Sequence, residues 1–320
     1  MDERTLYTTR FALMGGSGLI RFVDRRGRTE AQRLARAAEA EALRIEWKFS
    51  RYREASVVSE ITRNAGRTPV AVDDETELLV AAALDLARLT RGRFDPTVGV
   101  LRRAWDFRAR RVPAPDEIAA LLPLVNFEAV SIREKTVFLR RPGMELDLGG
   151  VGKEYAADRV ADLLEEGGVE SALINFAGDV RTVGGRGDGW PWSVGVADPR
   201  EAGRVRFALR FPGAAGVATS GDYERCFVVD GVRYHHLLDA TTGRPARGVA
   251  SATVLARTAF EAGRLATASF LLGADEGLTV IARGGAEGAL VLEDGSIRAT
   301  PGMDRYSDLP GSLYAAYPAI

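Results

Sequence analysis

The chain has 320 residues, of which 46% are hydrophobic and 27% charged, and its formal net charge at pH 7 is -1. This length allows one large domain or two with a sizeable core, and the near-neutral charge gives no reason to expect nucleic acid or an anionic membrane as a partner. The single cysteine, Cys226, excludes a disulfide framework within the chain and a multi-cysteine zinc site.

The N-terminal segment shows no targeting signal. Asp2 and Glu3 precede residues that lack a long apolar core followed by small residues, so the segment does not resemble a signal peptide. No run of residues approaches the ~18 to 20 apolar residues of a membrane span. We therefore expect a cytoplasmic protein, or an exported one if a leader peptide has been removed.

The first part of the chain alternates strand and helix patterns. Residues 11–23 predict two short strands about a glycine-rich bend, and residues 29–47 predict a long amphipathic helix. Residues 49–66 are expected to be irregular with a helical turn. The helical period returns over residues 73–91 and ends at Gly92.

The middle of the chain holds the most informative single stretch, residues 145–160. An apolar strand is expected to end at Asp147, and three glycines then allow the backbone to turn tightly and approach a ligand. Lys153 opens a helix whose free N–H groups favour an anion such as phosphate or pyrophosphate. The spacing fits neither the dinucleotide fingerprint nor the P-loop, and an ordinary turn without a ligand is the alternative.

Hairpins and helical crossovers are both predicted elsewhere. The Asp230-Gly231 pair signals a hairpin, and a polar turn is expected at Gly178-Asp179. Together these patterns favour an α+β fold with mixed or antiparallel sheets and packed helices over a doubly wound parallel sheet. The other predicted elements are a helix from Ala114, strands over 130–141, 192–199, 205–211, 216–221 and 250–256, helices over 154–167 and 258–273, and a closing hairpin over 288–299.

Eight segments match, in order, the successive signatures of one known family. They are MGG at Met14, SRYREASVVSEI at Ser50, GRFDPTVGVLRRAWDF at Gly92, DLGGVGKEYAAD at Asp147, NFAGDV at Asn175, ATSGDYER at Ala218, HLLDATTGRP at His236 and LATASFLLG at Leu265. On these motifs the chain resembles the ApbE-type FAD:protein FMN transferases over residues 14–273. An unrelated mixed fold that keeps the motifs only as turns is the alternative.

The resemblance implies an ApbE-like (T-fold-like) α+β architecture, built as a single domain over residues 1–320 or as two intertwined α+β subdomains. It also implies an enzyme that binds FAD and uses Mg²⁺ to activate the pyrophosphate. Such an enzyme transfers FMN to a threonine of an acceptor flavoprotein through a phosphoester and releases AMP; some members hydrolyse FAD instead. Phosphoryl transfer needs positioning and charge neutralisation, which Lys153 and the glycine turn can supply.

The resemblance also assigns site residues. His236 would be the base for the accepting hydroxyl, since the unperturbed pKa of histidine is near neutrality; a strand-end histidine bonded to backbone is the alternative. For the turn that contains Asp95, a helix-capping role is likewise the alternative. The residues expected to bind FAD are Met14, Tyr52, Arg93, Phe94, Asp95, Asp147, Lys153 and Leu237.

The metal site is where the sequence departs from the family pattern. The family helix reads D-A-L-x-T, and its aspartate and threonine bind Mg²⁺ with a main-chain oxygen of the glycine turn. Here Gly263 replaces the aspartate, which leaves Thr267 and the carbonyl of Gly150. Since Mg²⁺ prefers a carboxylate, we expect it to be held weakly or lost, and Gly263→Asp to strengthen the metal dependence. Glu154 stands where the family has glycine, and either turns away from the pyrophosphate or binds metal.

Two functions therefore stay open on the sequence. One is an active transferase with an atypical Mg²⁺ site, acting on FAD and an acceptor flavoprotein. The other is a flavin-binding relative that carries FAD or FMN, or uses it in redox chemistry, without transfer. The family resemblance favours the enzyme and Gly263 favours the binder.

Overall fold

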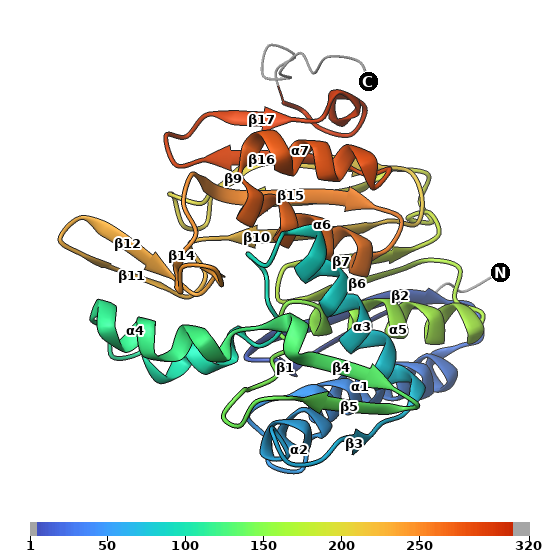
Figure 1. The fold of residues 1–320 in the computed structure, drawn as a ribbon. Coiled ribbons are helices and arrows are strands. Elements are labelled where there is room, and N and C mark those ends of the chain that lie inside the picture. Colours follow the sequence, from blue (N-terminus) through green and yellow to red (C-terminus); the bar gives the residue numbers. More distant parts are fainter. Residues whose placement is uncertain (1–4, 310–320) are drawn as a thin grey trace.

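A computed structural model of the chain describes residues 5–309; Asp2 and Glu3, on which the expected absence of a signal peptide partly rests, lie outside this range. The chain folds around an eight-stranded sheet in the order β1-β2-β6-β7-β10-β15-β16-β17, with every neighbouring pair antiparallel (Figure 1). The prediction of an α+β fold is confirmed. The strands of this sheet are β1 (Thr5–Leu13), β2 (Gly16–Asp24), β6 (Ala172–Phe176), β7 (Asp179–Val183), β10 (Gly216–Gly221), β15 (Val249–Ala256), β16 (Glu287–Leu292) and β17 (Ile297–Ala299).

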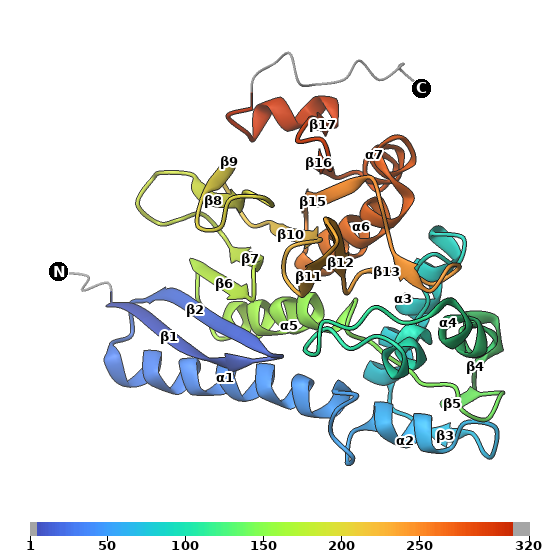
Figure 2. The same cartoon turned by 90° about the vertical axis from the view of Figure 1, so that its left-hand side faces the viewer.

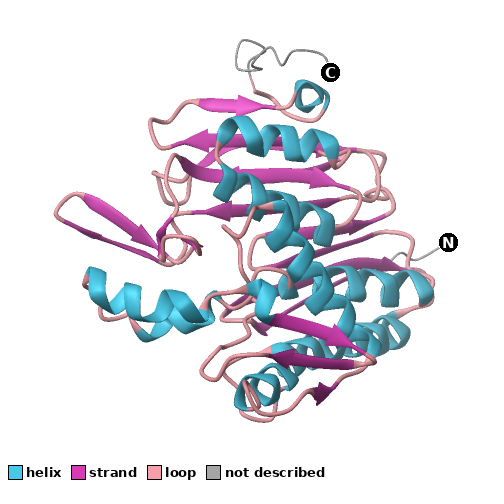
Figure 3. Ribbon diagram, in the orientation of Figure 1, coloured by secondary structure: helices cyan, strands magenta, loops and turns pink. Residues whose placement is uncertain are grey.

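Helices cover one face of the large sheet (Figure 3). The first long helix packs on β1 and on the central helix α5, α6 lies on β10 and β15, and α7 lies on β16. The helix α7, of 10 residues, was not predicted. The helices are α1 (Arg28–Phe49), α2 (Val57–Arg63), α3 (Asp74–Leu89), α4 (Pro115–Leu121), α5 (Gly152–Glu166), α6 (Ala259–Leu272) and α7 (Ala274–Arg283).

The opposite face of the sheet carries a second apolar core. There the hairpin of β8 (Trp192–Ala197) and β9 (Val205–Phe211) packs with the short helix η4 (Pro301–Arg305) against β10, β15 and β16. The central strand β15 is therefore buried on both faces, including its polar residues Ser251 and Thr253.

Smaller elements extend the molecule beside the sheet (Figure 2). The hairpin of β11 (Cys226–Val229) and β12 (Val232–His235) projects from the body and packs through Phe227 on Trp105 and Ile118. Its turn falls at Asp230 and Gly231, both with positive φ, as predicted. The remaining elements are β3 (Val70–Ala71), β4 (Val130–Arg133), β5 (Thr136–Leu139), β11 (Cys226–Val229), β12 (Val232–His235), β13 (Leu238–Asp239), β14 (Arg244–Pro245), η1 (Val98–Arg103), η2 (Leu122–Leu124) and η3 (Phe127–Ala129).

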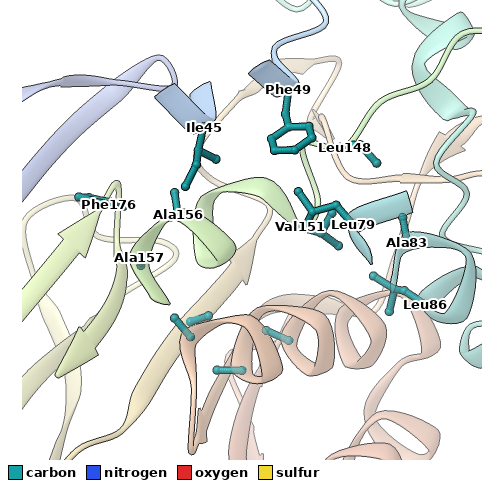
Figure 4. Close-up of a cluster of buried hydrophobic side chains, with 14 of the residues drawn as sticks. Ile45, Phe49, Leu79, Ala83, Leu86, Leu148, Val151, Ala156, Ala157 and Phe176 are labelled. Atoms are coloured by element: carbon teal, nitrogen blue, oxygen red, sulfur yellow. The ribbon is translucent and has the colours of Figure 1, made fainter. Parts of the chain in front are cut away.

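The helix α5 runs through the main core, where Ala156 and Ala157 allow neighbouring elements to approach closely (Figure 4). Ile45 of α1 and Phe176 of β6 are fully buried in the same core. The turn before α5 is anchored there through buried side chains at Val151 and the preceding Leu148. The core thereby fixes where the glycine turn and the N-terminus of α5 lie.

Two local predictions were wrong. The extended segment before the glycine turn is not a strand, because the N–H groups of Leu146 and Asp147 donate to Thr62 Oγ1 (3.1 Å) and to the carbonyl of Pro96 (2.7 Å) rather than to a neighbouring strand. The turn expected at Gly178-Asp179 lies one residue earlier, at Ala177 and Gly178, and Asp179 begins β7. The organisation of residues 1–320 as a single domain stays a prediction.

Candidate functional site

The glycine turn leads into α5 with its backbone close to neighbouring groups. A Cβ atom on Gly150 would lie 2.6 Å from Cε2 of Phe94, so only glycine fits above that buried ring. The N-cap residue, Val151, makes no side-chain hydrogen bond to the first turn of α5. The N–H of Gly152 donates to the Leu148 carbonyl (3.0 Å), and the dipole of α5 favours an anion at this end.

Lys153 adds a positive charge in the first turn of α5. Its Nζ lies 2.5 Å from Oδ2 of Asp179, a buried carboxylate that also accepts a hydrogen bond from the Thr219 N–H at 3.3 Å. Burial opposes the charge on Lys153, but the carboxylates of Asp179 and Glu154 hold its pKa above the ordinary value. Lys153 is therefore a fixed cation at the predicted phosphate site.

His236 follows β12 and lies among cations. Its backbone N–H donates to the carbonyl of Arg225 (3.1 Å), while the ring nitrogen Nδ1 is buried without a hydrogen-bond partner among the described residues. Burial lowers the pKa of His236 to about 3, and the charges of Arg225, Arg102 and Lys153 add to this effect. The imidazole is therefore neutral in this structure, with a polar atom shielded from water.

The adjacent His235 has the structural role that the sequence analysis gave as the alternative for His236. Its Nε2 lies 3.0 Å from the carbonyl oxygen of Ala246, and its ring stands edge-on to Phe270 with centroids 5.6 Å apart. This histidine, rather than His236, is the strand-end histidine bonded to backbone.

The lowered pKa of His236 predicts a pH-dependent stability. Between pH 6.5 and pH 3 the unfolded chain binds a proton that the folded site excludes, so this contribution is present above pH 6.5 and is lost as the pH falls. We expect the free energy of unfolding of the parent, relative to His236→Gln, to fall by about 1 kcal/mol between pH 7 and pH 5.5. Urea titrations of both proteins at each pH measure this difference. Parallel pH curves for the two proteins would contradict it.

The hairpin of β1 and β2 comes close to the same cations. Met14 occupies its turn with a φ of 50° and donates its N–H to Oε1 of Glu46 (3.0 Å). A Cβ atom on the next residue, Gly15, would lie 3.2 Å from Nη2 of Arg225. Leu237 packs against the main core, directly after His236. The structure thus brings Met14 and Leu237 to the neighbourhood of Arg225 and His236.

Tyr52 and Asp147 are joined by arginines. Arg102 donates to the Tyr52 hydroxyl at 2.5 Å, and its Nε lies 3.6 Å from Oδ2 of Asp147. The same Asp147 oxygen accepts from Nη1 of Arg51 at 2.9 Å. Burial opposes the charge on Asp147, but Arg51 and Arg102 hold its pKa below the ordinary value. Tyr52 is 70% exposed beside a hollow of about 670 Å³. The charge of Arg102, which bonds to Tyr52, also lowers the pKa of His236.

Asp95 and Arg93 are held by neighbouring chain segments. The buried Asp95 carboxylate accepts from the N–H groups of Thr97 and Phe127, both at 2.7 Å, so it caps the turn, which is the alternative role that the sequence left open. Burial raises the pKa of Asp95. Arg93 donates to the Leu271 carbonyl at 2.8 Å and borders a second hollow of about 410 Å³.

Oxygen atoms gather beside α6, where the sequence predicts a metal. Oγ1 of the buried Thr267 lies 3.2 Å from Oγ of Ser220 on β10. Glu154 is 6% exposed, and its Oε2 has no hydrogen-bond partner among the described residues. Burial and the nearby charge of Asp179 raise the pKa of Glu154. Carboxylate and hydroxyl oxygens are the ligands that Mg²⁺ prefers, so this donor set fits that ion.

Four further residues of the site were not predicted. They lie inside motifs that carried the family resemblance, so those motifs were the signal that could have found them. These residues are Arg102, Asp179, Ser220 and Arg225.

Comparison with solved structures identifies the class of fold. The structure matches the flavin transferase ApbE from Vibrio cholerae with a TM-score of 0.84 and 28% identity, covering 95% of this chain and 100% of that one. It matches the ApbE protein of Thermotoga maritima with a TM-score of 0.86 and 37% identity, covering 94% and 99%. The antiparallel sheet, its helical layer and the glycine turn are thus those of a flavin transferase fold.

Sequence comparison gives the same family. The ApbE family model matches residues 14–290. The FAD:protein FMN transferase of Vibrio cholerae serotype O1 is 32% identical over 272 residues, which is 83% of this chain and 81% of that protein. The FAD:protein FMN transferase of Treponema pallidum is 33% identical over 274 residues, covering 80% and 76%. The chain belongs to the ApbE family. No helix among residues 5–309 is long and apolar enough to cross a membrane.

Proposed function

We propose that this chain is an FAD:protein FMN transferase that transfers FMN from FAD to a threonine of an acceptor flavoprotein and releases AMP. The observation that supports this most directly is the group of cations around His236, of which Lys153 lies in the first turn of α5. Lys153, Arg102 and Arg225 all act on the same imidazole, that of His236. Such a cluster suits a pyrophosphate group, whose negative charges the cations and the helix N-terminus would offset.

In the proposed reaction a bond forms between the threonine oxygen and the phosphorus of the FMN half of FAD. The bond from that phosphorus to the bridging oxygen breaks, and AMP leaves with the bridging oxygen. His236 accepts the proton of the threonine hydroxyl. Pyrophosphate bound among Lys153, Arg102 and Arg225 would offset the charges that lower the pKa of His236, and so would make the imidazole a better base.

The flavin and adenine parts of FAD would be held by residues around this centre. Met14 precedes Gly15, which lies beside Arg225, and Leu237 directly follows His236. Tyr52 offers an exposed aromatic face for stacking. Thr267 and the carbonyl of Gly150 are oxygen donors that would hold Mg²⁺. When bound, Mg²⁺ supplies neutralisation of the charge that develops on the phosphate oxygens.

The second candidate is a flavin-binding protein without transfer activity. Gly263 favours it, because the family's metal-binding aspartate is missing from α6. Asp147 and Asp95 allow either function, since the contacts described above already satisfy their carboxylates.

The test is to mix the purified protein with FAD and an acceptor peptide that carries the family's threonine site, with and without Mg²⁺. Bound flavin, AMP and modified peptide are then measured separately. We expect metal-dependent AMP release matched by FMN on the peptide. AMP without peptide modification would indicate hydrolysis of FAD, and tight FAD binding without AMP would favour the flavin-binding alternative.

A further inference from the structure

The helices α5 and α6 pack antiparallel, with a register that the hydrogen bonds define. Oδ1 and Oδ2 of Asp158 accept from the N–H groups of Ala259 (2.9 Å) and Phe260 (2.8 Å) at the start of α6. One turn earlier on α5, Glu154 meets Gly263, which lies one turn later on α6. Thr267 lies one further turn along α6 from Gly263, and the glycine turn that contains Gly150 directly precedes α5.

Glu154 fills the space that the missing side chain of Gly263 leaves. A Cβ atom on Gly263 would lie 2.4 Å from Cγ and 2.6 Å from Oε1 of Glu154. The two positions therefore share one volume, and a carboxylate occupies it from α5. Glu154 of α5 thus places a carboxylate where the missing acid at position 263 of α6 would lie.

One oxygen of the buried Glu154 carboxylate lacks a hydrogen-bond partner among the described residues. Glu154 is 6% exposed and its Oε2 makes no hydrogen bond within the described part of the chain. A buried carboxylate oxygen without a partner is costly, so such groups commonly mark a ligand or ion. Residues 5–309 contain no cluster of three or more His, Cys, Asp or Glu side chains placed for a metal. A site here would therefore combine one acid with hydroxyl and carbonyl oxygens.

We propose that Glu154 is the carboxylate ligand of the divalent cation at this site, together with Thr267 and the carbonyl of Gly150. The inference rests on the proposed function for the presence of Mg²⁺, but it concerns which residue binds the ion. It resolves the alternatives for Glu154 in favour of metal binding. It also removes the argument that Gly263 leaves the chain without a metal carboxylate.

The same geometry corrects the expectation for Gly263→Asp. In the parent chain the new Cβ atom would collide with the side chain of Glu154, so the single substitution should displace that carboxylate and crowd two acids into one place instead of simply strengthening metal dependence. The acid can be moved to α6 only if Glu154 is removed as well. The paired variant Glu154→Gly with Gly263→Asp is therefore the informative one.

The experiment measures Mn²⁺ binding to the full chain with saturating FAD, by the electron paramagnetic resonance signal of free Mn²⁺. We expect Glu154→Gln, which keeps the shape of the side chain, to weaken Mn²⁺ binding by at least ~100-fold. Loss of a residue that only hydrogen-bonds to a metal ligand already weakens metal binding by up to about that factor. The control Glu165→Gln, exposed on the same helix, should bind like the parent. Circular dichroism confirms that each variant is folded.

The paired variant should bind Mn²⁺ at least ~10-fold more tightly than Glu154→Gly alone, because it returns a carboxylate to the same volume. Parental Mn²⁺ affinity in Glu154→Gln, no Mn²⁺ binding by the parent, or no recovery in a folded paired variant would each overturn the inference. Assays of AMP release on the same proteins keep the two proposals apart. If the parent binds Mn²⁺ through Glu154 but releases no AMP, the inference stands and the transferase function fails.

Discussion

Replacing His236 with glutamine should lower the rate of FMN transfer by ~10²- to 10⁴-fold, the usual contribution of a positioned general base. The reason is that no other group accepts the threonine proton in the proposed reaction. FAD affinity should change little, because glutamine is also neutral and the surrounding cations remain. Single-turnover measurement of FMN on the acceptor peptide gives the rate, and fluorescence quenching of free FAD gives the affinity.

The pH profile separates a base from a structural role for His236. In the parent, the rate at saturating FAD should rise with pH as the imidazole loses its proton, and this limb should disappear in His236→Gln. A variant that transfers FMN within tenfold of the parent, or that keeps the same rising limb, would remove His236 from the reaction.

Replacing Lys153 with methionine should both destabilise the fold and weaken FAD binding. The substitution leaves Asp179 buried without its cation. We expect this to lower the free energy of unfolding by ~2 to 3 kcal/mol, somewhat less than the cost of breaking a fully buried pair, because Lys153 reaches solvent. The loss of a charged contact to phosphate should weaken FAD binding by ~10- to 100-fold. Urea denaturation and FAD titration measure the two effects.

A second substitution tells these effects apart. Lys153→Met combined with Asp179→Asn removes both charges, so stability should largely recover while FAD affinity stays low. Lys135→Met is the control, since Lys135 pairs with Asp74 at the surface and should contribute less than ~1 kcal/mol. If the double variant regains parental FAD affinity, Lys153 does not contact the pyrophosphate.

Much of the fold could be predicted because local patterns and tertiary packing agree. The amphipathic period of α1, the caps of α3 and α6, and the turn of the β11–β12 hairpin are all visible in the sequence. The segment before Asp147 was misread as a strand because an apolar run does not reveal its hydrogen-bond partners. These are a side chain and a loop carbonyl from distant parts of the chain.

The candidate site was predictable in its residue types and less so in its contacts. The glycine turn and Lys153 were recognisable from local chemistry, and both substitutions, at Glu154 and Gly263, were visible as departures from a pattern. Their contact was not, because it depends on the register of two helices that lie far apart in the sequence. The ion pair of Lys153 with Asp179 has the same origin.

The shared volume of Glu154 and Gly263 bears on how relatives of this chain should be recognised. A search that requires an acid at position 263 would discard every sequence that carries the acid on the facing helix. Such a search would label these proteins inactive because of a single residue position. In this chain one acid and one glycine share that volume, with the acid on α5, so the two positions have to be considered together.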